Sequence, residues 1–298
     1  VMGVDMATSQ DFMTWTCGPR LRPMYLLYAL RAMKQEFARL VMGSTHKTIY
    51  MPDIERLTIP LPTIREQEAI ADTLSNLDAV IESLERVLTK KRLIKQGAMQ
   101  DLLTSSRRMP GFNRPWSTVS LGMLGPWYGG MTPSMRRLDY WYPPSIPWVT
   151  PADMKFRTLF DAGFSVSDRA IAERATTVVP ARAVLVVVRS GILRKQLPVA
   201  VNSKPMAINQ DLKALVPSAD YDSEFLLQAM LFHGGDIRAR CLKSGTTVES
   251  IHFGWLKAYE IAIPEHSEQV AIGRVLSDLD AEIAALEEKV RKLADLRR

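Results

Sequence analysis

The 298-residue sequence contains few residues of the kinds that build disulfide frameworks, metal sites and membrane spans. Its two cysteines, Cys17 and Cys241, are too few for a disulfide framework and favour a reducing compartment. Its four histidines lack metal-ligand spacing, and no apolar run approaches the roughly 18 residues of a membrane span. The chain begins with Val1 and shows no secretory signal. We therefore expect a cytoplasmic protein without a membrane partner, whose true start lies upstream.

The motifs of common enzymes are missing as well. The sequence has no P-loop and no Gly-rich nucleotide fingerprint between a strand and a helix. Tyr142-Pro143-Pro144-Ser145 resembles the Asn/Asp-Pro-Pro-aromatic motif of amino-methyltransferases, but both flanking residues differ, so we interpret it as a proline turn. We expect neither a catalytic centre nor a metal site in this chain.

The charge balance is modestly positive. Lys and Arg outnumber Asp and Glu by 38 to 32, which gives a net charge of +6. Such a balance is compatible with a nucleic-acid partner, but many proteins that bind none share it. The charge alone does not decide the function.

What the sequence does contain is a long internal repeat. The segment that starts at Gly43 aligns without a gap with the segment that starts at Gly245, an offset of 202. Upstream, MATSQDF at 6–12 matches MAINQDL at 206–212 with an offset of 200, which a two-residue insertion in a loop explains. Identical pairs in the first alignment include Pro62 and Pro264, Gln67 and Gln269, and Asp78 and Asp280.

The two copies are incomplete. Residues 109–200 have no earlier counterpart, and QGAMQDLLTSSRRMPGF has no later one. The chain thus covers about one and a half repeats, as a truncated gene product, a circularly organised variant or a trimmed chain would. We divide it into the end of a first globular unit (1–62), a spacer helix (63–108), a complete globular unit (109–263) and a second spacer helix that stops early (264–298).

Heptad spacing marks both spacer segments. From Ile70 to Leu88, and again from Ile272 to Leu293, apolar residues alternate at intervals of four and three. The first helix is expected from about Ile64 to Leu103, a length of roughly 60 Å at 1.5 Å per residue. Antiparallel packing of the two helices would give pseudo-twofold symmetry. A helical hairpin that only dimerises and a helix that packs on its own domain remain open as alternatives.

The complete globular unit reads as strand-rich. Its short apolar runs are interrupted by Gly and Pro, with a buried strand expected at Ala183–Val188 and a helix at Ser223–Arg238. The fold class is therefore α+β. Core packing is the expected role of five aromatic residues, Trp127, Tyr128, Tyr140, Trp141 and Trp148.

Three polar stretches of this unit carry side chains of the kinds that contact nucleic acids. They are YGGMTPSMRR at 128–137, VVVRSGILRK at 186–195 and LKSGTTVES at 242–250. Cationic and hydroxyl side chains suit phosphates, whereas Arg, Asn and Gln suit base edges. Each stretch taken alone is also explained by a solvated polar turn. The candidates are Arg136, Arg189, Ser190, Lys195, Lys243 and Ser244, Lys47 in the first copy, and the amides Gln10, Asn209 and Gln210.

These segments resemble the specificity subunits of Type I restriction-modification systems. IPLPTIREQEAIADTLSNLDAVIESLERVLTKKRLIKQGAMQDLLTS is similar to their central spacer region. GGMTPSMRRLDYWYPPSIPWVTPADM is similar to the opening of a target-recognition domain, and NQDLKALVP with SGTTVESI to its closing part. The resemblance covers nearly the whole chain in the family's order.

The resemblance implies strand-rich target-recognition domains joined by long helices in an antiparallel coiled coil. Each domain would recognise one half of a split site in double-stranded DNA. Methyltransferase subunits using S-adenosylmethionine and an ATP-driven restriction subunit would supply the chemistry, with no cofactor on this chain. It implies DNA contacts at Gly129, Gly130, Thr132, Pro133, Ser134, Gly245, Thr246, Thr247, Gly43, Ser44 and Thr45. A coiled-coil scaffold that recognises no bases is the alternative, and an independent nuclease or methyltransferase is a third.

Overall fold

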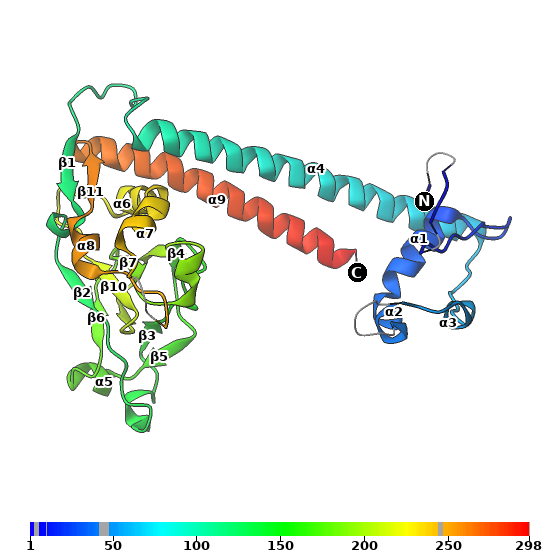
Figure 1. Cartoon of the computed structure of the whole chain (residues 1–298), viewed down its shortest axis with the longest axis horizontal. Helices are drawn as coiled ribbons and strands as arrows, with labels where there is room; N and C mark the ends of the chain where they lie inside the picture. The colour runs from blue at the N-terminus through cyan, green and yellow to red at the C-terminus, as the bar shows by residue number, and fades with distance from the viewer. Residues whose placement is uncertain (3–5, 10, 42–47, 244–246, 298) are drawn as a thin grey trace. The chain divides into compact units, whose positions relative to one another are not determined.

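The computed structural model describes residues 1–2, 6–9, 11–41, 48–243 and 247–297, and it divides into two compact units (Figure 1). Unit 1 comprises Val1–Lys90 and Ile283–Arg298, and unit 2 comprises Lys91–Glu282. The helices α4 (Ile64–Leu103) and α9 (His266–Leu296) each contribute one part to each unit. The bounds of α4 confirm the predicted first helix, whereas the four-part domain division stays a prediction. Within the described ranges, no helix combines the length and apolar character needed to cross a membrane.

The described residues of unit 1 form three short helices in addition to its parts of α4 and α9. They are α1 (Pro23–Ala32), α2 (Lys34–Leu40) and α3 (Met51–Glu55). A proline suits the first position of α1, where no backbone N–H is needed. The α1 helix buries Tyr25 and Tyr28, and the Tyr28 hydroxyl donates to Asp78 Oδ2 on α4 at 3.1 Å. The tyrosines thus fix α1 to the unit through apolar packing and hydrogen bonds.

Unit 2 contains three small sheets. The five-stranded sheet has the order β2 (Trp127–Gly129), β10 (Leu212–Leu215), β7 (Val184–Val187), β8 (Val199–Asn202) and β4 (Thr158–Leu159). The four-stranded sheet has the order β5 (Phe164–Val166), β3 (Ile146–Val149), β9 (Met206–Ile208) and β6 (Thr177–Val179). β1 (Ser117–Ser120) pairs with β11 (Glu260–Ile263). All of β7 is buried, which confirms the strand predicted from the apolar run.

Besides its parts of α4 and α9, the described residues of unit 2 form the helices α5 (Asp168–Ala172), α6 (Ser223–Phe232), α7 (Gly234–Cys241) and α8 (Phe253–Ala258). The prediction of one helix over Ser223–Arg238 is wrong, because α6 ends at Phe232 and α7 starts at Gly234. Two consecutive glycines lower the helix propensity there, which favours the break. The main core lies where α6 packs on the five-stranded sheet.

The aromatic residues of unit 2 mostly pack as predicted. Trp148 and Tyr140 are buried, while Trp127 and Trp141 are half-buried. The rings of Trp141 and Trp148 meet edge to face at 5.2 Å. Tyr128 is the exception, because it is 41% exposed.

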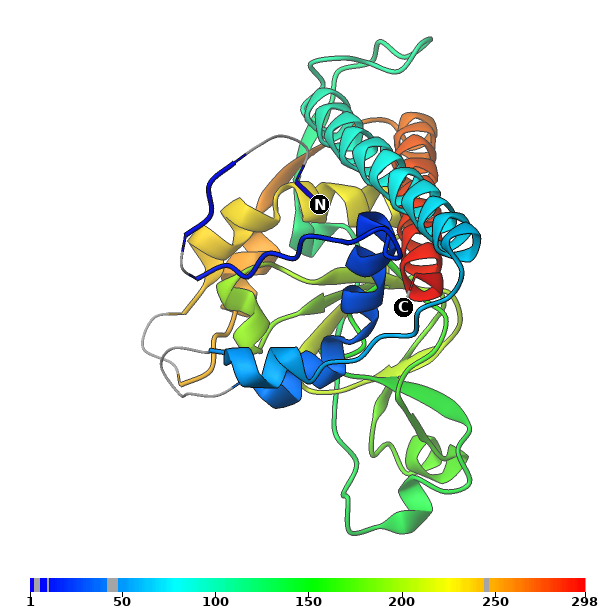
Figure 2. The same cartoon turned by 90° about the vertical axis from the view of Figure 1, so that its right-hand side faces the viewer.

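The long helices α4 and α9 pack antiparallel, and their contacts follow a pseudo-twofold symmetry. In unit 2, Lys95 Nζ on α4 lies 2.5 Å from Asp280 Oδ1 on α9, and Figures 1 and 2 show this end of α4 alongside the start of α9. In unit 1, Arg297 Nη1 on α9 lies 2.9 Å from Asp78 Oδ1 on α4. Positions 95 and 297, like 78 and 280, differ by the repeat offset of 202. The same ion pair is therefore made twice with the two helices exchanged, which confirms the coiled coil.

The α9 helix packs on its own domain as well. Gly273 lies so close to the start of α6 that a Cβ there would be 2.9 Å from Phe225 N. Farther along, Gln228 Nε2 donates to Asp280 Oδ2 at 2.8 Å. Two of the alternatives left open by the sequence therefore hold together, pairing with the other helix and packing on the domain.

Each long helix has one buried glutamine that binds the backbone of the segment before the helix, and the two glutamines are equivalent in the repeat. Gln67 and Gln269 are both fully or almost fully buried, and each accepts one backbone N–H and donates to two backbone carbonyls. The offsets between their partners reproduce the offsets of the sequence repeat, 202 at the proline and 200 upstream. Gln67 binds Arg22 N, Arg20 O and Pro62 O, and Gln269 binds Asp222 N, Asp220 O and Pro264 O.

Candidate nucleic-acid interface

The loop after β2 lies directly against the turn between β9 and β10. A Cβ at Gly130 would stand 1.9 Å from Asn209 O, so only glycine fits this approach. Next to it, the Thr132 hydroxyl donates to the Gln210 side chain. Two regions that the sequence separates by about eighty residues therefore form one surface.

The loop after β7 joins the other side of the same turn. Arg189 N donates to Asp211 O at 3.3 Å, and Arg189 Nε lies 4.0 Å from an Asp211 carboxylate oxygen. The Arg189 side chain is 61% exposed. Ser190 N donates to Glu249 O at 3.0 Å, which brings in the third polar stretch.

That third stretch is held by short backbone pairings. Leu242 and Ile251 form an antiparallel bridge, and Lys243 N donates to Ser250 O at 2.9 Å. The exposed Lys243 and Thr247 lie on this loop. The backbone contacts link the loops after β2, after β7 and around Lys243 through the turn after β9. We call this surface, made of residues 129–134, 189–195, 209–213, 242–243 and 247–250, the loop surface.

The predicted residues differ in accessibility. Exposed side chains are Thr132, Ser134, Arg136, Arg189, Lys195, Gln210, Lys243 and Thr247, and Gly129, Gly130 and Ser190 are half-buried. Pro133 and Asn209 are buried. The Asn209 side chain accepts from Asp211 N at 3.1 Å and donates to the Asp211 carboxylate at 3.2 Å, so it shapes the turn. Gln10, Gly43, Ser44, Thr45, Lys47, Ser244, Gly245 and Thr246 lie outside the described residues.

The two neighbouring arginines of the first stretch have different environments. Arg137 donates to Asp139, Tyr140 and Glu173, whereas Arg136 is exposed. Hydrogen bonds from Arg169, Tyr140 and Arg137 hold the pKa of Glu173 down to about 2. Arg137 is therefore neutralised within the domain, and Arg136 is the better candidate for a phosphate contact.

The loop surface also contains Lys213, a cation that is not among the predicted DNA contacts. Lys213 lies on β10 opposite Gly129, and its Nζ is 2.6 Å from where a Cβ of Gly129 would be. The Nζ also lies 5.2 Å from the centre of the Phe253 ring. In the sequence, Lys213 stands among strand-forming residues in NQDLKALVP. This pattern predicts a strand, but it does not show that β2 with Gly129 is the neighbouring strand.

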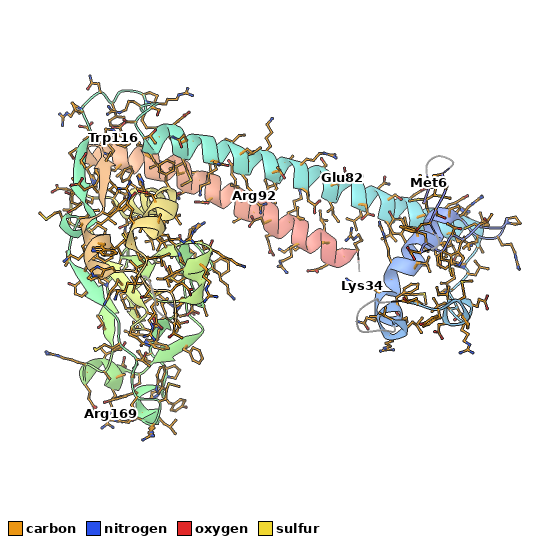
Figure 3. The ribbon with its side chains drawn as sticks, in the orientation of Figure 1. Met6, Lys34, Glu82, Arg92, Trp116 and Arg169 are labelled. Carbon is orange, nitrogen blue, oxygen red and sulfur yellow. The ribbon has the colours of Figure 1, made fainter. Side chains whose placement is uncertain are left out.

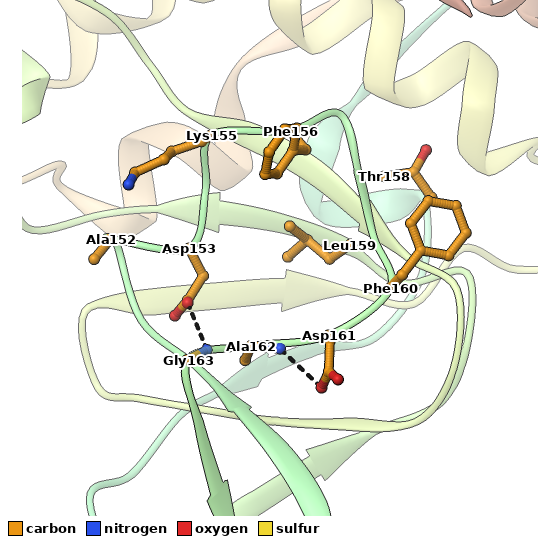
Figure 4. Close-up of a pocket in the computed structure, with 10 residues that line it drawn as sticks. All are labelled: Ala152, Asp153, Lys155, Phe156, Thr158, Leu159, Phe160, Asp161, Ala162 and Gly163. Carbon is orange, nitrogen blue, oxygen red and sulfur yellow. Dashed lines mark hydrogen bonds between the residues drawn. The ribbon is translucent and has the colours of Figure 1, made fainter. Parts of the chain in front are cut away.

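A separate hollow of 510 Å³ lies in the loop of residues 152–163 (Figure 4). The Asp153 carboxylate accepts from Gly163 N at 2.9 Å and closes the loop, and Phe156 and Phe160 are about 70% exposed beside it. None of the predicted DNA contacts lines it. In the part of the chain that the structure describes, no group of three His, Cys, Asp or Glu side chains is arranged to hold a metal ion.

Sequence comparison finds similarity over most of the chain. The family described as Type I restriction modification DNA specificity domain matches residues 2–93 and 113–294. The EcoR124I/EcoR124II specificity subunit of Escherichia coli is 30% identical over 281 residues, covering 92% of this chain and 67% of that protein. The MjaIX specificity subunit of Methanocaldococcus jannaschii is 26% identical over 170 residues, 56% of this chain and 38% of the relative.

Solved structures show the same fold. An S subunit of a Type I restriction-modification system from M. genitalium superposes with a TM-score of 0.65 at 16% identity, over 93% of this chain and 71% of that one. A chain from a study of complex assembly of the type I R-M system gives a TM-score of 0.56 at 20% identity, over 92% and 68%. At these sequence identities, the structural similarity is evidence of a common fold alone.

Proposed function

The chain belongs to the Type I restriction modification DNA specificity family, and we propose that it recognises one bipartite DNA sequence on behalf of a restriction-modification complex. Unit 2 recognises one half of the site through the loop surface. The repeated segments of unit 1 serve the other half. The antiparallel helices α4 and α9 set the unread gap between the halves.

The observation that carries this proposal is the convergence of four chain segments on the loop surface. Backbone hydrogen bonds tie the segments together, so exposed Arg189, Lys195 and Lys243 stand on a fixed frame. Cations suit the phosphates, while the exposed amide of Gln210 suits a base edge. Buried Pro133 and Asn209 support the frame in this proposal.

The chemistry falls to partner subunits. Methyltransferase subunits carrying S-adenosylmethionine modify the site, and a restriction subunit driven by ATP cleaves DNA. This chain supplies the sequence specificity, holds no cofactor and has no catalytic role. The complex works in the cytoplasm, where its DNA is. A coiled-coil scaffold that reads no bases has no observation in its favour.

Selection from random duplex DNA tests the proposal. The chain, assembled with the methyltransferase subunits of its system, is incubated with a random pool, and bound DNA is sequenced over several rounds. We expect enrichment of a split motif with a fixed gap. A single half-motif would restrict recognition to unit 2, and a stable complex that enriches no sequence would overturn the proposal.

A further inference from the structure

An exposed apolar pair projects from unit 2 beside the loop surface. The short helix η2 (Leu138–Tyr140) follows Arg137, and Leu138 and Tyr142 are 77% and 76% exposed. Tyr142 N donates to Leu138 O at 2.9 Å, so the two side chains lie one helical turn apart. We call residues 135–142 the tip. Two large apolar side chains, each about three-quarters exposed on one short segment, are available to contact a binding partner.

The tip is held rigidly from behind. Tyr140, between the exposed residues, is buried, and its hydroxyl donates to Glu173 at 2.7 Å. Ser167 N donates to Tyr140 O at 2.8 Å, and the Ser167 hydroxyl donates to Asp139 O at 2.5 Å. These contacts fix the tip to the start and end of α5. Little conformational entropy is then lost when the exposed pair binds a target.

The charges around the tip favour an anionic target. Asp139 and Glu173 are each engaged by Arg137 and Arg169. Exposed Arg136, by contrast, makes no ion pair within the described ranges. The acids are therefore compensated inside the protein, and a free cation stands two residues before Leu138.

The tip is continuous with the loop surface. Trp141 Nε1 donates to Ser134 O at 3.2 Å, and Trp148 Nε1 donates to Met131 O at 3.1 Å. Two tryptophans thus connect the tip to the loop that packs on Asn209. Figure 3 places Arg169, beside the tip, at the end of unit 2 opposite Trp116. DNA that binds along the loop surface would therefore also lie against the tip.

We propose that Leu138 and Tyr142 insert into a groove of the bound DNA and wedge open one base step, while Arg136 contacts the flanking phosphate. This inference rests on the proposed DNA recognition. Apolar side chains that enter a groove unstack neighbouring base pairs and bend the duplex, and the deformation cost depends on the step. The tip therefore adds a preference for a flexible step, such as TA or CA, to the half-site that unit 2 recognises.

The test uses the duplex selected by the wild-type complex, with 2-aminopurine replacing each adenine in turn. Unstacking raises the fluorescence of 2-aminopurine at the wedged step. The variants are Leu138→Ala, Tyr142→Ala and the conservative Tyr142→Phe, in the complete complex. Phe156→Ala, an equally exposed aromatic on the 152–163 loop (Figure 4), is the matched control.

We expect the wild type to raise fluorescence at one step severalfold. Leu138→Ala and Tyr142→Ala abolish the rise and weaken binding about tenfold, whereas Tyr142→Phe and Phe156→Ala retain both. Specific binding without a fluorescence rise at any position overturns the wedge but leaves the proposed function intact. Variants that bind DNA normally but no longer hold the methyltransferase subunits would make the tip a protein contact and also overturn it. Loss of sequence selection by the wild type itself would count against the proposed function instead.

Discussion

At the scale of the residue, the cations in and beside the loop surface differ in whether groups of the protein already bind their side chains. Arg194 pairs with the Glu249 carboxylate, and Arg238, which lies on α7 outside the loop surface, donates to three backbone carbonyls of residues 193–195. Among the residues that the structure describes, the Arg189 side chain has a single ion-pair contact, at 4.0 Å with Asp211, and the Lys243 side chain is exposed. The latter two keep their charge available for phosphates.

Replacing either available cation should therefore weaken DNA binding in a salt-dependent way. For Arg189→Ala and Lys243→Ala we expect the slope of log affinity against log salt to fall by about one unit each, because one phosphate contact is lost. Binding isotherms at several salt concentrations measure the slope. Lys90→Ala, an exposed lysine of α4, is the control and should leave it unchanged. Unaltered slopes for both loop variants would count against the loop surface.

A second residue-scale prediction concerns the carboxylate behind the tip. The pKa of Glu173 is about 2 in the folded protein and 4.5 without its partners, so its ionised form stabilises the fold above pH 4.5. This contribution is lost as the pH falls from 4.5 towards 2. We expect Glu173→Gln to unfold more easily than wild type at pH 7, with a difference that shrinks towards pH 3.

Denaturant titrations at pH 7, 4.5 and 3 measure that difference. Glu85→Gln, on an exposed position of α4, controls for the loss of a surface charge. A difference between wild type and Glu173→Gln that stays constant over this range would contradict the assigned role of the Arg137, Arg169 and Tyr140 hydrogen bonds.

At the scale of the element, the repeat predicts equivalent contacts only where both copies supply the partners. Gln67 and Gln269 share their hydrogen-bond pattern because each needs only backbone groups. Glu66 instead caps its own helix at Thr63, whereas Glu268 is buried and binds Arg108 and Trp116. The difference follows from position 265, where glutamate replaces the capping threonine, and from side chains that unit 2 alone contributes.

Some features of the elements follow from the spacing of apolar residues in the sequence, and others depend on contacts that the sequence does not reveal. Heptad spacing predicted the helix α4 correctly because an apolar stripe can be recognised from the sequence alone. The burial of Asn209 and Pro133 depends instead on a loop that approaches from far away in the sequence, as does the contact between Gly130 and Asn209. The polar composition of the loop surface was therefore predictable, and the division of its residues into exposed and structural was not.

The buried hydrogen bonds of Gln269, which we call the glutamine clamp, lead to a prediction about how α9 is held. Gln269→Glu keeps the size of the side chain but turns its amide donor into an acceptor facing the carbonyls of Asp220 and Pro264. The buried Pro264 carbonyl and the Asp220 carbonyl then lose their donor and face an acceptor, so we expect a loss of about 2–4 kcal/mol in the free energy of unfolding. Chemical denaturation measures it. Gln100→Glu, an exposed glutamine of α4, should change stability by less than about 0.5 kcal/mol. Equal effects of the two variants would show that the clamp is dispensable.

At the scale of the whole molecule, the repeat makes the coiled coil symmetric about its middle. Lys95 with Asp280 and Arg297 with Asp78 are the same contact at positions 202 apart. Residues inserted at equivalent places between these pairs, in both helices, preserve the register of each ion pair. The gap between the proposed DNA half-sites can then be changed by altering the helices alone.

Duplicating one heptad in each helix should lengthen the gap in the recognised site. Residues 81–87 are repeated in α4 and residues 283–289 in α9, which keeps the apolar seam continuous. Seven residues add roughly 10 Å, and at 3.4 Å per base pair this corresponds to about three base pairs. Selection from random duplex DNA should return the same two half-motifs with the longer gap. Duplication in α4 alone is the control, since it moves Asp78 away from Arg297 and should impair assembly without defining a new gap. An unchanged gap in the double insertion would mean that the helices hold the domains without setting their spacing on DNA.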